Sequence, residues 1–598
     1  MTAARRVAAA LAVITLVAAP TAAGQDTTRV RADSLPGAAP DSQIPHDPFA
    51  HGRTLPMFEP EVPPGPLPPG SRYTFTRDSL LWAGALTLAD LLARIPGVYV
   101  ARAGFIGQPE YVQYGGRGGA ALEVFWDGMR WEPLGGDTVF VDPGDFPLTY
   151  FRRVDIEVLP GMLRAYLVTE RHETPVVRSK IHVQSGAFKS AQYAALFQKR
   201  TASGIELDLA ANYAGTDGPG GAAGADLFDV WARVSWMPDG RVGASYQIRR
   251  QDVDRDGLPS GAGTSVPTRN GARTDMLITL SAATRPDGLG LRVETGLASS
   301  VWSADSGAVL SDHGVRQAHL GVRYRRPSWT VDAVGRVADA RTPVGVEGRI
   351  GWVPVRGIVL AADGGYRRHR GDRHSQWVRG AVGVYLGPVT LAGEATLREA
   401  VQAPALVDDS VIPTRDLAAR AGLDTRWLSG TVTLARQDAF QPRPYADLPI
   451  VPSLGAAGET TYLRVEATLR PWKALTLSGW YSDPLSGTPA GLQPPQHVRA
   501  ALTWRSKYWR TFRSGAFDLK AQVAIETWGA GTAGARADGS VIALPEATFW
   551  ETQIEFQLVD FTAFWALRNA RLTDAEYVPG LAYPVNAQYF GVSWTFGN

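Results

Sequence analysis

The 598-residue sequence contains no cysteine, and its formal net charge is only +2. Without cysteine, the protein has no disulfide bonds, no thiol chemistry and no cysteine-ligated zinc. The small net charge and the lack of a lysine- and arginine-rich face argue against a nucleic-acid partner. The histidines are few and scattered, and nothing indicates a nucleophile, base and orienting group that would meet, so we do not expect an enzyme. Beyond the N-terminus, no apolar stretch is long enough for a membrane-spanning helix.

What the sequence does contain is a long series of segments in which apolar and polar residues alternate. Side chains of a β-strand alternate between its two faces, so each segment has one apolar and one polar face. The pattern repeats from about residue 176 to the C-terminus, which favours a membrane barrel with lipid outside and a wet lumen over a soluble sandwich. Clear examples are residues 205–213, 463–470, 550–558 and 590–596.

The connections between these segments alternate between tight and long. Tight connections include residues 237–240 and 470–473, and long ones include residues 252–273 and 438–459. Outer-membrane barrels alternate short periplasmic turns with longer extracellular loops in this way. We therefore expect an all-β transmembrane barrel of about 22 antiparallel strands, beginning with residues 176–185 and large enough to hold a plug. A porin-sized barrel of roughly 16 to 18 strands is the competing count.

Residues 1–24 have the features of a secretory signal peptide. Arg5 and Arg6 form a basic region, and residues 7–19 are apolar. Residues 20–24 are mostly small, as at the site where a signal peptide is cleaved. A short membrane anchor is the alternative, but the apolar run is too short to span a bilayer. Export combined with a barrel pattern predicts the outer membrane of a diderm bacterium.

Three further regions follow the signal peptide. Residues 25–70 are rich in proline and polar residues, and we expect a disordered periplasmic tether. Residues 71–174 have the pattern of a small α+β domain, in which a helix ends at Pro96 and Gly97 and short strands follow. Residues 175–598 form the predicted barrel.

Several short motifs lie along the chain from about residue 85 onward. They are residues 88–98, Gly116-Arg117-Gly118, residues 124–128 and 151–161, and, at the barrel end, Asn569, residues 572–574, Tyr577 and residues 589–596. In order and spacing, these motifs resemble those of the TonB-dependent outer-membrane receptors. The resemblance implies that the small domain is a plug inside the barrel lumen. The chain departs from the family after Gly161, where residues 162–169 are shorter than the usual segment and lack its glycines.

The resemblance implies that the protein binds a scarce solute outside and imports it with energy that TonB transmits from the inner membrane. Asp26, Thr27, Thr28, Arg29 and Val30 are similar to the family's TonB box, a short segment that pairs with TonB as an added strand. Ferric chelates are the family's commonest cargo, and cobalamin, glycans and peptides are others. The sequence does not choose among them.

The implied partners are the TonB periplasmic domain with its inner-membrane complex, the barrel-assembly machinery, outer-membrane lipid and lipopolysaccharide, and a small-molecule ligand. Two other functions stay open. One is a plugged outer-membrane barrel with a structural or ligand-binding role and no TonB coupling, which the departure after Gly161 supports. The other is a passive diffusion channel, which a plug of this size would obstruct.

Five plug residues lie near turns that reach towards the ligand in the family: Phe105, Gln108, Tyr111, Arg130 and Trp131. Aromatic and arginine side chains suit a bound chelate or glycan. They suit packing of the plug against the barrel wall equally well.

His369 and His374 lie among arginines on a predicted external loop. They suit a metal or an anionic ligand, and the alternative is a solvated face that meets lipopolysaccharide phosphates.

Asp252, Asp254 and Asp256, followed by Gly257, have the spacing that lets three carboxylates converge on calcium in a loop. The twelfth position of an EF-hand would be glutamate, whereas this chain has Gly263 and no helical frame. Calcium in an extracellular loop is therefore the only cofactor that the sequence suggests, with an ordinary acidic rim turn as the alternative.

Overall fold

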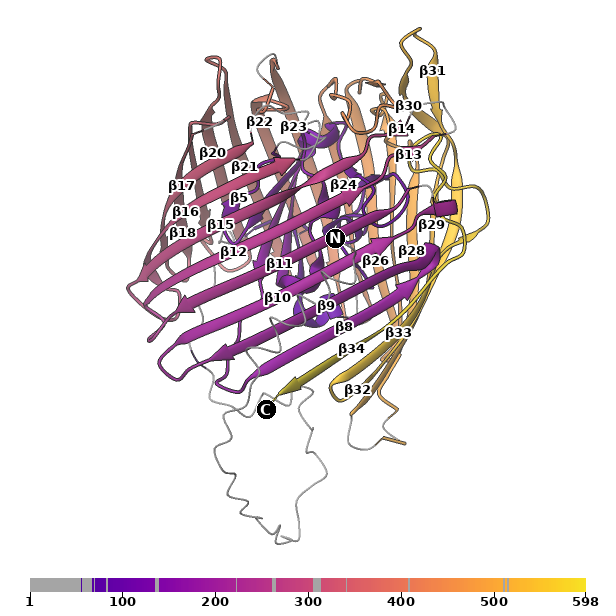
Figure 1. Cartoon of the computed structure of the whole chain (residues 1–598). Helices are drawn as coiled ribbons and strands as arrows, with labels where there is room; N and C mark the ends of the chain where they lie inside the picture. The colour runs from indigo at the N-terminus through magenta and orange to yellow at the C-terminus, as the bar shows by residue number, and fades with distance from the viewer. Residues whose placement is uncertain are drawn as a thin grey trace.

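A computed structural model shows a barrel with a small domain in its lumen (Figure 1). The suggested TonB box, Asp26 to Val30, and the signal peptide lie outside the residues that the structure describes. The described residues are 55, 67–68, 70–81, 84–134, 139–221, 223–260, 265–304, 313–339, 341–406, 409–508, 511–512 and 516–597.

Within these residues, 22 antiparallel strands form a closed barrel, in which the last strand pairs with the first. The predicted count and the predicted first strand are confirmed, and the porin-sized count is wrong. The strands are β8 (Arg178–Gly186), β9 (Ser190–Arg200), β10 (Ile205–Thr216), β11 (Ala225–Trp236), β12 (Val242–Arg255), β15 (Arg269–Ala283), β16 (Gly290–Ala304), β17 (Gly314–Arg325), β18 (Trp329–Ala338), β19 (Val344–Trp352), β20 (Ile358–Arg368), β21 (His374–Leu386), β22 (Val389–Val401), β23 (Val411–Asp424), β24 (Leu428–Gln437), β26 (Thr460–Trp472), β27 (Leu475–Ser486), β28 (His497–Ser506), β29 (Phe517–Trp528), β32 (Ala547–Leu558), β33 (Phe561–Arg571) and β34 (Ala587–Gly597).

The alternation of the sequence maps directly onto the two faces of the barrel wall. On β23, Leu417 faces outward and is 46% exposed, whereas its neighbour Asp416 faces the lumen and is 2% exposed. Leu417 has the contact surface that lipid requires, and Asp416 is buried because the plug fills the lumen. Among the described residues, no helix is long and apolar enough to cross a membrane.

The plug is built on a five-stranded mixed sheet with the order β1-β6-β7-β4-β5. Residues 162–169, where the sequence departs from the family pattern, form β7, which pairs antiparallel with β6 and parallel with β4. The departure therefore leaves the sheet complete. The sheet strands are β1 (Arg72–Thr76), β4 (Leu122–Trp126), β5 (Met129–Arg130), β6 (Phe151–Leu159) and β7 (Met162–Thr169).

A second hairpin and several short helices complete the plug. β2 (Tyr99–Arg102) pairs with β3 (Glu110–Gln113). The helix predicted before Pro96 is present but short, as α3 (Leu88–Leu92), and its apolar side chains enter the plug core. The other helical segments are α2 (Arg77–Leu81), η1 (Gly118–Ala121), η2 (Pro143–Asp145) and η3 (Leu148–Tyr150), with η4 (Ala187–Lys189) and η5 (Pro219–Gly221) in the barrel connections.

The two ends of the barrel differ as the sequence predicts. The C-terminus lies at the end with the tight turns, and the longer loops lie at the opposite end (Figure 1). Two of these loops together form a small sheet, in which β25 (Ser453–Leu454) pairs with β30 (Gly531–Ala535) and β30 pairs with β31 (Val541–Leu544). A further loop contains the hairpin of β13 (Leu258–Pro259) and β14 (Ser265–Val266).

Candidate ligand site at the plug and the extracellular loops

The tip of the plug is covered by loops from the long-loop end of the barrel. Tyr111 of β3 is fully buried, and its ring stacks on Tyr445 with 4.0 Å between the ring centroids. The Tyr111 hydroxyl donates a hydrogen bond of 2.6 Å to Asp447 Oδ1. A shared apolar core joins the plug tip to these loops, so they close over the plug from outside. The loops that contribute to this core include residues 438–459, 529–546 and 572–586.

Polar contacts fix the register between the loops and the plug. Gln113 Nε2 donates a hydrogen bond of 2.8 Å to the Tyr445 hydroxyl, which in turn donates to the Val112 carbonyl at 3.3 Å. The backbone N–H of Gly116 donates to Gln493 Oε1 at 3.0 Å. Because these partners are buried, opening the loops exposes apolar surface and breaks several hydrogen bonds together.

Three of the five predicted plug residues lie beneath this cover. Tyr111 contacts the loop directly, and the Phe105 ring lies 5.8 Å from the Phe188 ring of the β8–β9 connection. Gln108 is 4% exposed, and its side-chain amide has no hydrogen-bond partner within the described part of the chain. Gln108 and Tyr111 are buried, so a solute reaches these two side chains only after the loops have moved, whereas Phe105 is partly exposed.

The other two predicted plug residues line a small chamber between the plug and the barrel wall. Arg130 and Trp131 meet His369 there, so the structure brings together three residues that the sequence singled out. The cavity measures about 60 Å³. Its charged lining comprises Arg130, Arg341, Arg367, Arg398, Glu123 and Glu132.

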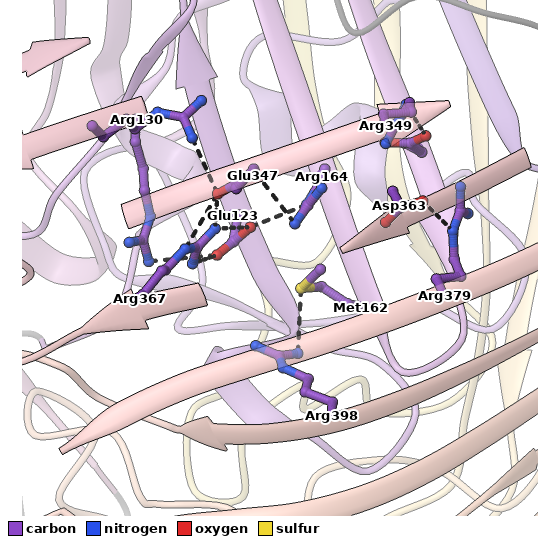
Figure 2. A network of polar contacts seen from close by, with 12 residues as sticks. Glu123, Arg130, Met162, Arg164, Glu347, Arg349, Asp363, Arg367, Arg379 and Arg398 are labelled. Carbon is purple, nitrogen blue, oxygen red and sulfur yellow. Dashed lines mark hydrogen bonds and ion pairs between the residues drawn. The ribbon is translucent and has the colours of Figure 1, made fainter. Parts of the chain in front are cut away.

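Glu123 of β4 is the centre of the charge network in this chamber (Figure 2). Arg367 of β20 forms an ion pair with Glu123, and Arg164 of β7 contacts the same carboxylate at 3.1 Å. Arg130 lies 3.5 Å from it. Burial disfavours the charged carboxylate, but Arg367, Arg130 and Arg164 outweigh burial and hold the pKa of Glu123 well below its usual range.

Arg398 of β22 faces the same chamber, where the charge of Glu123 attracts it without forming an ion pair. Its guanidinium contacts Met162 Sδ at 3.3 Å and forms no ion pair with any described carboxylate. Figure 2 shows this contact beside the Glu123 network. Four arginines and two glutamates line the cavity, so the chamber has an excess of positive charge that suits an anion.

Comparison with known proteins agrees with this architecture. The family model described as the TonB-dependent receptor plug domain matches residues 68–161. This chain has the fold of a TonB-dependent outer-membrane receptor. No curated protein matches its sequence.

Similar solved structures share the receptor fold at low sequence identity. The siderophore receptor PirA of Acinetobacter baumannii matches with a TM-score of 0.65 and 9% identity, over 88% of this chain and 98% of PirA. A mutant ferric enterobactin receptor PfeA of Pseudomonas aeruginosa, in complex with enterobactin, matches with a TM-score of 0.65 and 12% identity, over 89% of this chain and 100% of PfeA. The copper transporter OprC matches with a TM-score of 0.62 and 14% identity, over 86% of this chain and 96% of OprC. The closed 22-strand barrel with a plug domain in its lumen indicates an outer-membrane protein.

The two histidines of the predicted external loop lie on opposite faces of the receptor wall. His369 faces the chamber, where Thr342 Oγ1 lies 3.0 Å from Nδ1 and Ser375 Oγ lies 2.8 Å from Nε2. Burial and the charges of Arg130 and Arg367 lower the pKa of His369 to about 3, so the ring is neutral. His374 instead stacks on the outward-facing Tyr366, with 6.0 Å between ring centroids. The two rings therefore share no site.

The carboxylates suggested as a calcium site do not lie in one loop. Asp252 and Asp254 belong to β12, which extends further than the sequence indicated, and Asp256 follows its end. Alternate residues of a strand are about 7 Å apart, whereas calcium requires oxygens within about 2.6 Å of the ion. Within the described ranges, no group of three histidine, aspartate or glutamate residues could hold a metal ion. The structure therefore does not bring these three carboxylates together in one loop.

Buried ion pairs join the plug to the barrel wall. Arg117, part of the glycine-arginine-glycine motif, forms an ion pair of 2.6 Å with Asp416 of β23. Trp131 lies under the guanidinium of Arg273, 3.6 Å from the ring centroid, so packing against the wall explains this residue at least in part. The sequence analysis did not single out Glu123, Arg398 or the loop that contains Tyr445. Polar residues occupy every second position of the barrel strands, and nothing in that pattern indicates which of them contact the plug.

Proposed function

We propose that this receptor is an energy-coupled importer of a small anionic solute. The observation that carries the proposal is the arginine-rich chamber, in which Arg398 faces the cavity and forms no ion pair with any described carboxylate. A half-buried guanidinium without an ion-pair partner is costly, and an anionic ligand would offset that cost. Structural neighbours are described as receptors for siderophores and ferric enterobactin and as a copper transporter, which supports a chelate as the class of cargo.

The closure of the lumen supports energy coupling. The plug is held by buried ion pairs such as Arg117–Asp416 and is covered by the loop that contains Tyr445. Among the described residues, the plug and the loop cover both stand in the path of a diffusing solute, which disfavours a passive channel. We assign the coupling segment to Asp26, Thr27, Thr28, Arg29 and Val30, because added-strand pairing with TonB needs an accessible backbone and little sequence.

The coupling is tested by binding of the purified TonB periplasmic domain. We expect it to bind the intact receptor and to lose binding when residues 26–30 are deleted. Binding that is unaffected by the deletion would place the coupling segment elsewhere. Absence of binding to both forms would favour a plugged barrel with a structural or ligand-binding role.

The charge of the cargo is tested separately, with a panel of ferric chelates that carry negative, zero or positive net charge. We expect tight binding of anionic chelates only, and at least a tenfold loss in Arg398→Gln because one charge-assisted contact is removed. Arg415→Gln, on the outward face of the neighbouring strand β23, is the matched control and should bind as the wild type does. Equal binding of neutral and anionic chelates would refute the role of the chamber.

A further inference from the structure

A thioether and an imidazole meet where plug strand β5 contacts barrel strand β17. Met129 Sδ lies 2.7 Å from His319 Nδ1. Each of the two residues is 6% exposed, so solvent does not separate them. This pair lies outside the arginine-rich chamber, and neither side chain takes part in the proposed anion site.

The other ring nitrogen of His319 faces a carboxylate. Glu294 Oε1 of β16 lies 3.7 Å from Nε2, and Arg292 holds the second oxygen of Glu294 at 3.0 Å. A carboxylate on this side favours the tautomer with the proton on Nε2. In that tautomer Nδ1 carries a lone pair on the side of Met129 Sδ, so both atoms are available as donors to a cation.

A carboxylate beside the second ring nitrogen is also found at histidines that ligate metals, and here it lies 3.7 Å away, just beyond hydrogen-bond distance. Such a histidine usually donates its other ring N–H to a carboxylate, which fixes the tautomer and orients the ring. A cavity of about 70 Å³ adjoins His319 and has room for water beside the ring. Its charged lining comprises Asp127, Glu294, Asp332, Arg292, Arg323 and Arg336.

The two donor atoms select a soft metal. Thioether sulfur favours Cu(I)-type ions, whereas carboxylate and carbonyl oxygens favour calcium and magnesium. We propose that Met129 and His319 form a binding site for a soft monovalent cation of the Cu(I) or Ag(I) class, which would tie plug strand β5 to barrel strand β17. This inference does not depend on the import of an anionic solute.

Insertion of an ion requires a small movement that the methionine side chain allows. Metal–sulfur and metal–nitrogen bonds are about 2.3 and 2.0 Å in zinc sites, so the two atoms must move apart to roughly 4 Å. Methionine has three rotatable bonds and adapts its position in this way more readily than other apolar residues.

The test uses Ag⁺ with the full-length purified protein in chloride-free buffer. The chain has no cysteine, so no thiol competes for the ion. We expect one Ag⁺ per chain by mass spectrometry of the metal content. Met129→Leu and His319→Gln should each weaken binding at least tenfold, and Glu294→Gln roughly 10- to 100-fold through the ring orientation.

Matched controls separate this site from unspecific binding and from misfolding. Met162→Leu, the other plug methionine, and His374→Gln should retain the ion, because neither residue contacts the pair. X-ray absorption of the Ag⁺-loaded protein should show one sulfur and one nitrogen neighbour. Absence of stoichiometric Ag⁺ in the wild type, full binding by Met129→Leu, or an oxygen-only shell would each overturn the proposal.

Discussion

Replacing Tyr445 by alanine should release the extracellular loop of residues 438–459 from the plug. Tyr445 is 2% exposed, stacks on Tyr111 and exchanges hydrogen bonds with Gln113 and Val112. Truncation of a large buried aromatic residue to alanine costs roughly 3–5 kcal/mol. Because about 1.4 kcal/mol changes an equilibrium constant tenfold, the loop should open about 10²- to 10³-fold more often.

Hydrogen exchange followed by mass spectrometry measures this opening. In the closed loop, Phe440 and Ala457 exchange backbone hydrogen bonds of 2.9 and 2.8 Å, and the Leu448 N–H donates to the Tyr445 carbonyl. We expect these amides to exchange about 10²- to 10³-fold faster in Tyr445→Ala, while the amides of the barrel strands keep their wild-type rates.

Tyr445→Phe is the matched control. It keeps the stacked ring and loses only the hydroxyl, so the cost should be about 1 kcal/mol and the exchange roughly fivefold faster. If the exchange rate in Tyr445→Ala stays within about twofold of the wild type, the stacked pair does not hold the loop closed, and the argument from burial fails. Equal effects of both substitutions would assign the closure to the hydroxyl alone.

Three further predictions concern the plug. Because the folded pKa of Glu123 lies below its unfolded value of about 4.3, Glu123 stabilises the plug above that pH and loses this contribution as the pH falls through its folded pKa. Glu123→Gln should therefore lower the thermal midpoint at pH 7 and flatten its acid dependence; an unchanged pH profile would contradict this. Arg117→Gln should cost about 3–5 kcal/mol by leaving Asp416 buried without its partner, and Arg117→Met with Asp416→Leu should recover most of that loss in denaturant unfolding. Removal of residues 71–174 should open a large conductance in planar bilayers that the intact receptor lacks, and equal conductance of the two forms would refute closure by the plug.

The barrel was predictable from sequence because one physical constraint acts on every strand. Lipid on one side and a polar lumen on the other impose a period of two, so even the strand count and the closing segment Ala587–Gly597 follow from local pattern. The same period of two also limits what the aspartate motif can indicate. Asp252 and Asp254 satisfy a loop motif and a strand alternation equally well, and only the length of β12 distinguishes the two.

The candidate site was less predictable, because it depends on contacts between distant segments. Arg130, Trp131 and His369 were singled out by residue type, but nothing local indicated that Glu123 and Arg367 would meet around them. Closing the barrel places residues that are more than 200 positions apart in one chamber. The packing of the loops on the plug is equally non-local. Tyr445 can stack on Tyr111 only after both the plug and the barrel wall have folded.

The chemistry of the plug–wall contacts explains how a closed barrel remains able to open. Buried ion pairs such as Arg117–Asp416 gain little net stability, because the cost of desolvating two charges offsets most of their attraction. They specify one seated position, however, because a displaced plug leaves each charge without its partner. Water that enters behind a moving plug restores the solvation of those charges, which a purely apolar contact would not gain. A plug held by charges is therefore seated precisely but released at a moderate cost, which is the behaviour that the proposed import mechanism needs.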